Sequence, residues 1–160
     1  MASDIFLKLD SIVGESNDIK HKGEIEIDSF SWGVSQSGTF SAGGGGGAGK
    51  AQFQDFHFTT GASKASPSMF KACASGQHIK NAVLTVRKAG EQPLEYYHIK
   101  MSDVLVSSYQ SSGSGGGGVP TESLSLNFAK IEFSFTEQSA DGKPGATFSA
   151  GWDLKANKAV

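Results

Sequence analysis

The sequence predicts a mainly β protein, an antiparallel β-barrel or sandwich with one short helix. Three observations support this prediction. Apolar residues alternate with polar residues along most of the chain, which is typical of strands with one buried face. This alternation changes parity twice, which indicates bends or bulges of the kind that curl a sheet. One segment, beginning at Ser66 and Pro67, breaks the alternation and carries the end signals of a helix.

The N-terminal part of the chain predicts three short strands. The first spans Ile5–Leu9 and the second spans Glu24–Asp28. In the second strand the apolar residues occupy odd positions, whereas in the segment 30–34 they occupy even positions. Because side chains of a strand alternate between its two faces, this change predicts a bend or bulge near Ser29.

The later strands show the same pattern. A second parity change falls between Phe128 and Ile131 and predicts a second bend. Strands are predicted at residues 51–60, 82–87, 94–101, 104–106, 124–128, 131–135 and 147–154.

The predicted helix spans Ser66–Gly76. Ser66 is expected to be the N-cap, Pro67 the first helical residue and Gly76 the residue that ends the helix. Its apolar stripe is Met69, Phe70 and Cys73, and we expect this stripe to pack against the barrel.

Composition predicts a single domain spanning residues 1–160, with glycine-rich loops at 38–50 and 111–120. Of 21 glycines, 12 lie in these two tracts. The net charge of -2 offers no basic surface for nucleic acid. The chain begins without a secretory signal and has no apolar run long enough to insert into a membrane, so we expect synthesis in the cytoplasm. Cys73 is the only cysteine, which fits a reducing compartment.

The first glycine tract resembles a phosphate-binding P-loop but departs from it at one essential position. Gly44 and Lys50 have the P-loop spacing, yet Ala51 stands where the motif needs a Ser or Thr hydroxyl to hold magnesium. The residues that follow alternate like a strand, whereas a P-loop leads into a helix. We therefore expect no nucleotide binding and interpret the tract as a loop between strands.

No catalytic or metal-binding constellation is evident, and we expect no cofactor and no enzyme activity. None of the four histidines has a partner at metal-ligand spacing, although Asp55 with His57 and Glu95 with His98 could form ion contacts on strands. Cys73 is interpreted as a buried thiol.

Several consecutive segments resemble the haemolysin co-regulated protein (Hcp) family of bacterial type VI secretion. The resemblance covers residues 4–154 and rests on Phe30–Gly38, Ala48–Lys50, Ala72–His78, Leu84–Gly90, Val104–Ser108, Leu126–Ala129 and Gly151–Leu154. It implies a barrel with an outer helix that closes into a hexameric ring. It also implies rings stacked into a tube inside a contractile sheath and below a trimeric spike. The tube would be expelled from the cell and would carry small effector proteins in its lumen.

Two groups of residues are expected to act in such an assembly. The small residues Ser31, Gly33 and Ser35, with Ser37 beyond them, are expected to face the lumen and contact effectors. The loop residues Gly43, Gly44, Gly45, Gly46, Gly47 and Lys50 are expected to contact neighbouring subunits. Ordering about ten such residues in an isolated barrel would cost ~10 kcal/mol or more of backbone entropy.

Three alternatives stay open from the sequence. One is a phage tail-tube subunit, the second is a monomeric β-barrel that binds a small ligand, and the third is a phosphotransferase that uses Lys50. Solution mass tests the second alternative, and nucleotide titration tests the third.

Overall fold

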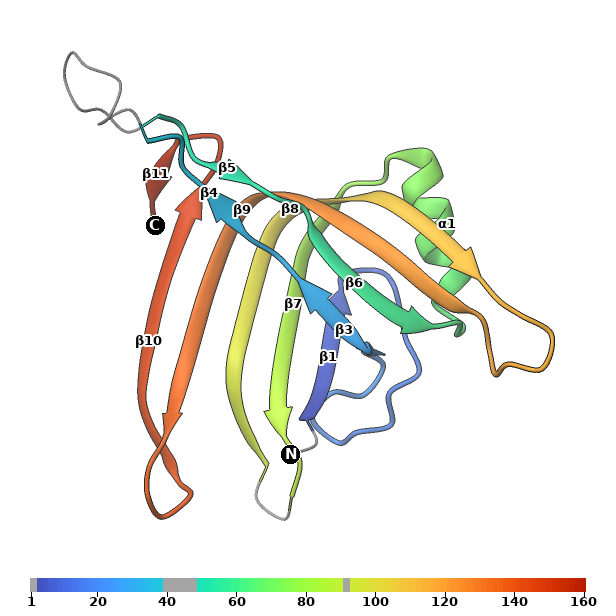
Figure 1. Ribbon diagram of the computed structural model, residues 1–160, viewed down its shortest axis with the longest axis horizontal. Coiled ribbons are helices and arrows are strands. Elements are labelled where there is room, and N and C mark those ends of the chain that lie inside the picture. The colour runs from blue at the N-terminus through green and yellow to red at the C-terminus, as the bar shows by residue number, and fades with distance from the viewer. Residues whose placement is uncertain (1–2, 39–48, 91–92) are drawn as a thin grey trace.

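Strands dominate the described part of the chain, and one helix there packs on them (Figure 1). The computed structural model describes residues 3–38, 49–90 and 93–160. In chain order its elements are β1 (Ser3–Leu9), β2 (Ile25–Glu26), β3 (Ser29–Ser31), β4 (Val34–Ser35), β5 (Gln52–Phe53), β6 (Phe56–Gly61), α1 (Ser66–Ser75), β7 (Ile79–Lys88), β8 (Leu94–Ser112), β9 (Thr121–Gln138), β10 (Pro144–Asp153) and β11 (Lys158–Ala159).

The main sheet closes on itself through the segment between β2 and β3. Its neighbours are antiparallel and run β2–β1–β7–β8–β9. The first half of β9 pairs with β6, and β6 pairs with β3. Because β2 and β3 are consecutive, the chain bridges both ends of the sheet: the N–H of Ile27 donates to the carbonyl of Ile5, and that of Asp28 to the carbonyl of Thr59. The predicted antiparallel barrel with one helix is confirmed.

The first parity change marks the point of closure. Ile25 and Ile27 are buried on one side of it, while Phe30 and Trp32 pack on the core on the other side. Because of this change of face, the short segment 25–31 pairs with β1 through β2 and with β6 through β3. The bend predicted near Ser29 is confirmed.

The second parity change lies in the long β8–β9 pair. On β9 both Phe128 and Ile131 are buried, and on β8 both Met101 and Val104 are buried. Asp103, which lies between the two β8 residues, has a φ of 54°. This left-handed residue shifts the inward positions from odd to even within one strand. The separate strands expected at 94–101 and 104–106 are therefore parts of a single element, β8.

Helix α1 has the predicted span, but two of its details differ from the prediction. Ala65 is the N-cap, and Ser66 is already helical; its hydroxyl accepts a hydrogen bond from the Ser63 N–H at 2.9 Å. Gly76 ends the helix with a φ of 65°, as expected. Met69 and Ala72 are fully buried, whereas Phe70 is 58% exposed. Adjacent helical residues point about 100° apart, so burying Met69 turns Phe70 away from the core.

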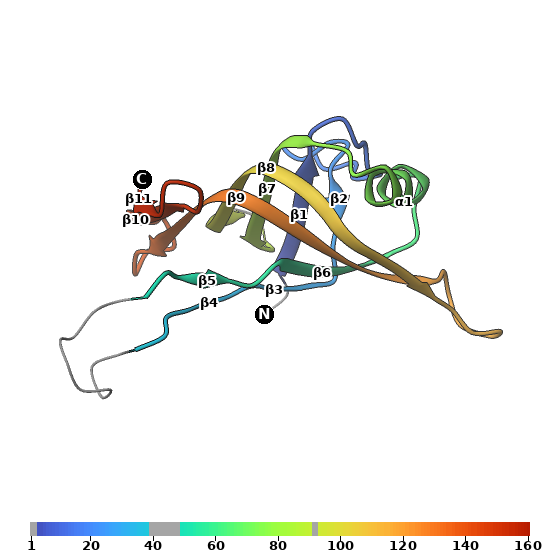
Figure 2. The same cartoon turned by 90° about the horizontal axis from the view of Figure 1, so that it is seen from above.

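The second half of β9 pairs with β10 and extends the sheet beyond the barrel. β10 begins at Pro144, three residues before its expected start, and β11, which pairs with it at only two positions, was not predicted. The loop expected at 111–120 is shorter, because Ser111 and Ser112 still pair in the β8–β9 hairpin. Figure 2 shows the β4–β5 ribbon and β10 at one side of the molecule, with α1 and the end of that hairpin at the other.

Candidate functional site

The small residues predicted to line a lumen lie on the outer face of the chain from β3 to β4. Ser31 and Ser35 are exposed, as is Ser37, and Gly33 is half-buried. The alternating aromatic residues point the other way. Phe30 stacks on Phe56 with ring centroids 5.9 Å apart. The alternation predicted from the sequence is therefore present.

This polar surface continues over β6, β8 and β9. Its extension across these strands was not predicted from the sequence. Ser31 pairs with His57 on β6, which pairs with Ser125 on β9. We define the serine-rich face by the residues that these pairs and their hydrogen bonds bring together on the outer side of the strands: Ser29, Ser31, Asp55, His57, Thr59, Ser107, Ser123, Ser125 and Asn127. Ser125 is buried within this face, where its hydroxyl bonds those of Ser107 and Ser108.

Asp55 organises the serine-rich face through hydrogen bonds. The Ser107 hydroxyl donates to its Oδ2 at 2.6 Å, and the Asn127 amide donates to its Oδ1 at 3.0 Å. Ser107 and Ser125 share a further bond of 2.7 Å between their hydroxyl oxygens. The predicted ion contact of Asp55 with His57 is absent among the described residues, because both carboxylate oxygens face these other donors. The face thus offers hydroxyl groups with little charge.

A cluster of ion pairs lies outside the serine-rich face, around Arg87 at the C-terminal end of β7. Arg87 donates to both carboxylate oxygens of Asp18, at 2.8 and 3.0 Å, and to Asp4 at 3.0 Å. The Arg87 guanidinium lowers the pKa of Asp18 to about 2, and these carboxylates raise the pKa of Arg87. The guanidinium also lies over the Phe6 ring, 5.0 Å from its centroid. This cluster fastens the loop after β1 to the barrel.

Three of the four histidines make contacts with carboxylates. His21 is buried against Phe6 and bonds Glu24 through Nδ1 at 2.8 Å. His98 lies 3.4 Å from Glu95, as predicted. His78 bonds Asp103 at 2.9 Å, and this bond lowers the Asp103 pKa. Across residues 3–38, 49–90 and 93–160, no group of three His, Cys, Asp or Glu side chains is placed to hold a metal ion.

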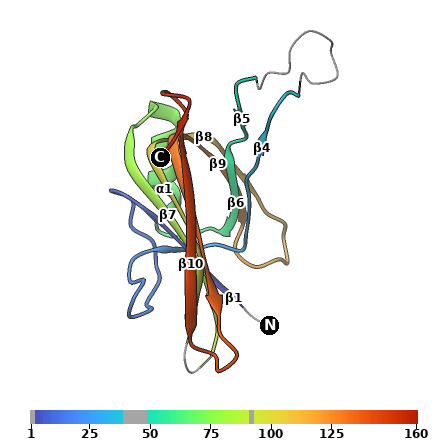
Figure 3. The ribbon, with the colours of Figure 1, turned by 90° about the vertical axis from the view of Figure 1, so that its left-hand side faces the viewer.

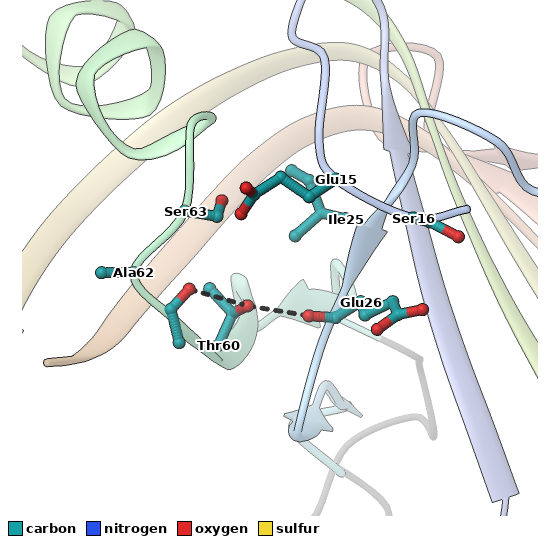
Figure 4. A pocket seen from close by; sticks show the side chains of 8 residues that line it. Glu15, Ser16, Ile25, Glu26, Thr60, Ala62 and Ser63 are labelled. Carbon is teal, nitrogen blue, oxygen red and sulfur yellow. Dashed lines mark hydrogen bonds between the residues drawn. The ribbon is translucent and has the colours of Figure 1, made fainter. Parts of the chain in front are cut away.

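One polar hollow of about 190 Å³ lies between the loop after β1 and the segment after β6 (Figure 4). Glu15, Glu26 and Ser63 contribute to its lining, and the Thr60 hydroxyl donates to the Glu26 carbonyl at 2.8 Å. The residues that line it include two carboxylates and no basic side chain. The Ser63 hydroxyl accepts a hydrogen bond from the Ala65 N–H at 3.2 Å.

A second surface is apolar and lies between the β4–β5 ribbon and β10 (Figure 3). We call it the Trp152 groove and define it by Trp32, Val34, Phe53, Phe133, Ala150 and Trp152. It consists of a hollow of about 200 Å³ and an adjoining one of about 520 Å³. These residues belong to segments predicted to be strands, but no sequence signal indicated a groove.

The predicted inter-subunit loop lies mostly outside the described residues, which exclude Gly43, Gly44, Gly45, Gly46 and Gly47. Lys50 is described and exposed. The chain after Lys50 forms β5 and β6, so the strand expected in place of a P-loop helix is confirmed.

A β-barrel with a hydroxyl-rich face and an apolar groove is typical of a protein that works through contacts with other protein chains. This chain belongs to the Hcp family of type VI secretion system proteins, because a family model described as "Type VI secretion system effector, Hcp" matches residues 6–135. It is 46% identical to Protein hcp1 of Pseudomonas aeruginosa over 159 residues, 98% of each chain. The resemblance stated from the sequence is confirmed, and it favours a secretion protein over a phage tail-tube subunit.

Solved structures agree with this assignment. Hcp1 from Salmonella typhimurium is 38% identical with a TM-score of 0.82, and the match covers all of both chains. A structure described as a type six secretion system protein has a TM-score of 0.94 at 32% identity, over 99% of this chain and 100% of that one. A type VI secretion system effector from Yersinia pestis is 35% identical with a TM-score of 0.78, over 94% and 99% of the two chains.

Within the part of the chain that the structure describes, no helix combines the length and apolar character that crossing a membrane requires.

Proposed function

We propose that this chain is the tube subunit of a type VI secretion system. Six copies close head to tail into a ring, rings stack into a tube inside a contractile sheath and below a spike trimer, and the lumen carries small effector proteins. The number six comes from the family resemblance. The chain then acts through its surfaces and its symmetry and not through a reaction. Export occurs through the secretion apparatus.

The observation that carries the ring is the presence of free strand edges at opposite sides of the barrel. β10 pairs with β11 only at Trp152 and Asp153, so its edge from Pro144 to Gly151 has no strand neighbour in the described chain. β8 loses its β7 neighbour beyond Val104. Exposed edges must be covered or used, and a head-to-tail ring uses two different edges of each copy.

The serine-rich face is proposed to line the lumen. Its side chains are short and mostly uncharged, which leaves a channel wide and lets it accept different effectors. Ser31 lies at the end of β3 and is exposed, so its enlargement need not disturb the core. Ser31→Gln should keep the rings and reduce effector retention, with Ile19→Gln on the exposed loop after β1 as the matched control. Loss of rings in the Ser31 variant would place Ser31 in an interface instead.

The glycine loop is proposed to contact neighbouring subunits, most directly those of the next ring. Removing three residues from Gly43–Gly47 should leave the circular dichroism spectrum unchanged and impair the stacking of rings. A shortened protein that stacks and is secreted like the parent would show that the loop is only a tether. Unfolding of the shortened protein would assign the loop to the core.

Light scattering after gel filtration tests the ring itself. The expected mass is about 100 kDa, six times the 16.7 kDa of one chain. A single sharp monomer peak at micromolar concentration would contradict the proposal and favour the monomeric ligand-binding barrel. Negative-stain microscopy of the same fractions shows whether the species are closed rings.

A further inference from the structure

The Trp152 groove is a preformed apolar site. Val34, Phe53 and Trp152 line both of its hollows. Its floor is fixed, because the Trp32 indole N–H donates to the Tyr97 hydroxyl at 2.9 Å and the Trp32 ring packs edge-on against Phe133. A rigid apolar hollow of this kind binds an apolar side chain without first having to change shape.

The apolar surface of the groove continues along β10. Phe148 is 60% exposed and pairs with Phe135 on β9, which is 44% exposed, while Val34 at the opposite rim is 53% exposed. Phe148, Ala150 and Trp152 alternate along β10 and so share one face. Contiguous exposed apolar side chains of this kind mark a protein interface.

The opposite side of the molecule carries an exposed aromatic knob. Phe70 on α1 is 58% exposed, and its ring lies 6.2 Å from the ring of Tyr109 on β8. The Tyr109 hydroxyl donates to Glu122, whose side chain is only 1% exposed, so the support beneath Phe70 is anchored in the barrel. Rigid exposed aromatic residues of this kind are the usual anchors of protein interfaces.

We propose that in the ring the Phe70 knob of one copy sits in the Trp152 groove of the next copy. This inference rests on the proposed ring. The groove is lined by β10 and the β4–β5 ribbon, and Phe70 belongs to α1. Figures 1 and 2 show these strands towards one end of the longest axis and α1 towards the other. A head-to-tail contact needs two different complementary surfaces on opposite sides of one chain, whereas a two-fold dimer needs one self-complementary patch. Charge also agrees, since α1 carries Lys71 without a carboxylate and β10 carries Asp153 without a cation.

A pair of charge variants tests which surfaces meet. Phe70→Asp disables the knob and leaves the groove intact, and Val34→Asp does the reverse. Both side chains are more than half exposed, so the barrel should fold, which circular dichroism checks. Each variant alone should shift in light scattering from about 100 kDa to 16.7 kDa. Ile19→Asp, at a position that is 98% exposed and belongs to neither surface, should keep the rings.

Mixing the two variants gives the decisive result. One intact knob and one intact groove remain in the mixture, so pairs should form, but the other ends of each pair are both blocked. The expected species at high micromolar concentration is a dimer of about 33 kDa, twice 16.7 kDa, and nothing larger. A variant that still forms rings, or a mixture that stays monomeric, overturns the pairing while the ring itself stands. A wild-type chain without rings refutes the proposed function as well.

Discussion

Replacing Tyr109 by Phe tests whether the Tyr109–Glu122 contact stabilises the barrel. The hydroxyl of Tyr109 is the hydrogen-bond donor to Glu122 Oε2, and Oε1 of the same carboxyl group has no partner among the described residues. Glu122 is 1% exposed, so water has little access to it. The variant therefore leaves a buried carboxyl group with neither oxygen bonded, while the ring that supports Phe70 stays in place.

The expected loss follows from this geometry. Removing one partner of a buried hydrogen bond leaves the other group to bear its full desolvation cost, about 1–3 kcal/mol. For a chain of this length a loss of about 2 kcal/mol lowers Tm by roughly 4–8 °C. The fall in Tm is measured by thermal unfolding with circular dichroism as the signal. All samples have the same protein concentration, because the Tm of an assembling protein depends on concentration. Rings should survive in the variant.

A second variant separates this explanation from a simple packing effect. Tyr109→Phe combined with Glu122→Met replaces both polar groups by apolar ones of similar shape, which is nearly neutral when a polar pair is removed together. The double variant should therefore be more stable than Tyr109→Phe alone. A Tyr109→Phe variant with the parent Tm, or a double variant that is less stable than the single one, would refute the reasoning.

Four further predictions concern ionisation, two glycines and nucleotide binding. Burial, and after it the Glu122 carboxylate, raise the pKa of Tyr109. The neutral Tyr109 side chain therefore stabilises the fold below about pH 10, and this stabilisation is lost as the pH rises further. Tyr109→Phe should remove the last step of a tyrosinate titration followed by ultraviolet absorbance. Arg87 lowers the pKa of Asp18 to about 2, so this ion pair stabilises the fold above about pH 4, and the stabilisation is lost as the pH falls towards 2. Asp18→Asn should lower Tm at neutral pH and flatten the dependence of Tm on pH in the acid range. An unchanged dependence of Tm on pH would contradict this. Gly14→Ala places a Cβ 2.5 Å from the Glu24 carbonyl oxygen and should cost roughly 1–3 kcal/mol in denaturant unfolding, whereas Gly33→Ala meets only the flexible Gln54 side chain at 3.4 Å and should be tolerated. Calorimetry with ATP and magnesium should show no saturable heat, because Ala51 lacks the hydroxyl and β5 replaces the helix; a signal that depends on Lys50 would overturn this.

The parity of apolar residues predicted the fold because it reports a local property of strands. Each change of parity corresponds to a real change of face, at the closure near Ser29 and beside Asp103. The helix span was equally local, since Pro67 and Gly76 mark its ends. Local signals of this kind act within a few residues and do not require knowledge of the partner strand.

The serine-rich face could be found only in part, because it is assembled across strands. Ser31 belongs to an alternating segment and was predicted to point outward. Its neighbours His57 and Ser125 come from segments 26 and 94 residues further along the chain, and only strand pairing places them beside it. The sequence does contain a signal for the β9 part, since Ser123, Ser125 and Asn127 alternate with buried apolar residues. The missing step was the register between strands, which the alternation within a single strand does not reveal.

The Trp152 groove shows why alternation cannot identify an interface. Phe148 and Trp152 have the same parity within the strand predicted at 147–154, so they lie on one face of β10. Alternation of apolar residues indicates that one face of a strand is shielded from water in the functional protein. It does not indicate whether the same chain or another chain covers that face. In the single chain Phe148 remains 60% exposed, so the chain itself leaves that face uncovered. An interface core resembles a domain core divided between two chains. The apolar face of β10 therefore has the pattern of an interior strand because, on the proposed pairing, the other half of its core is the α1 side of the neighbouring copy.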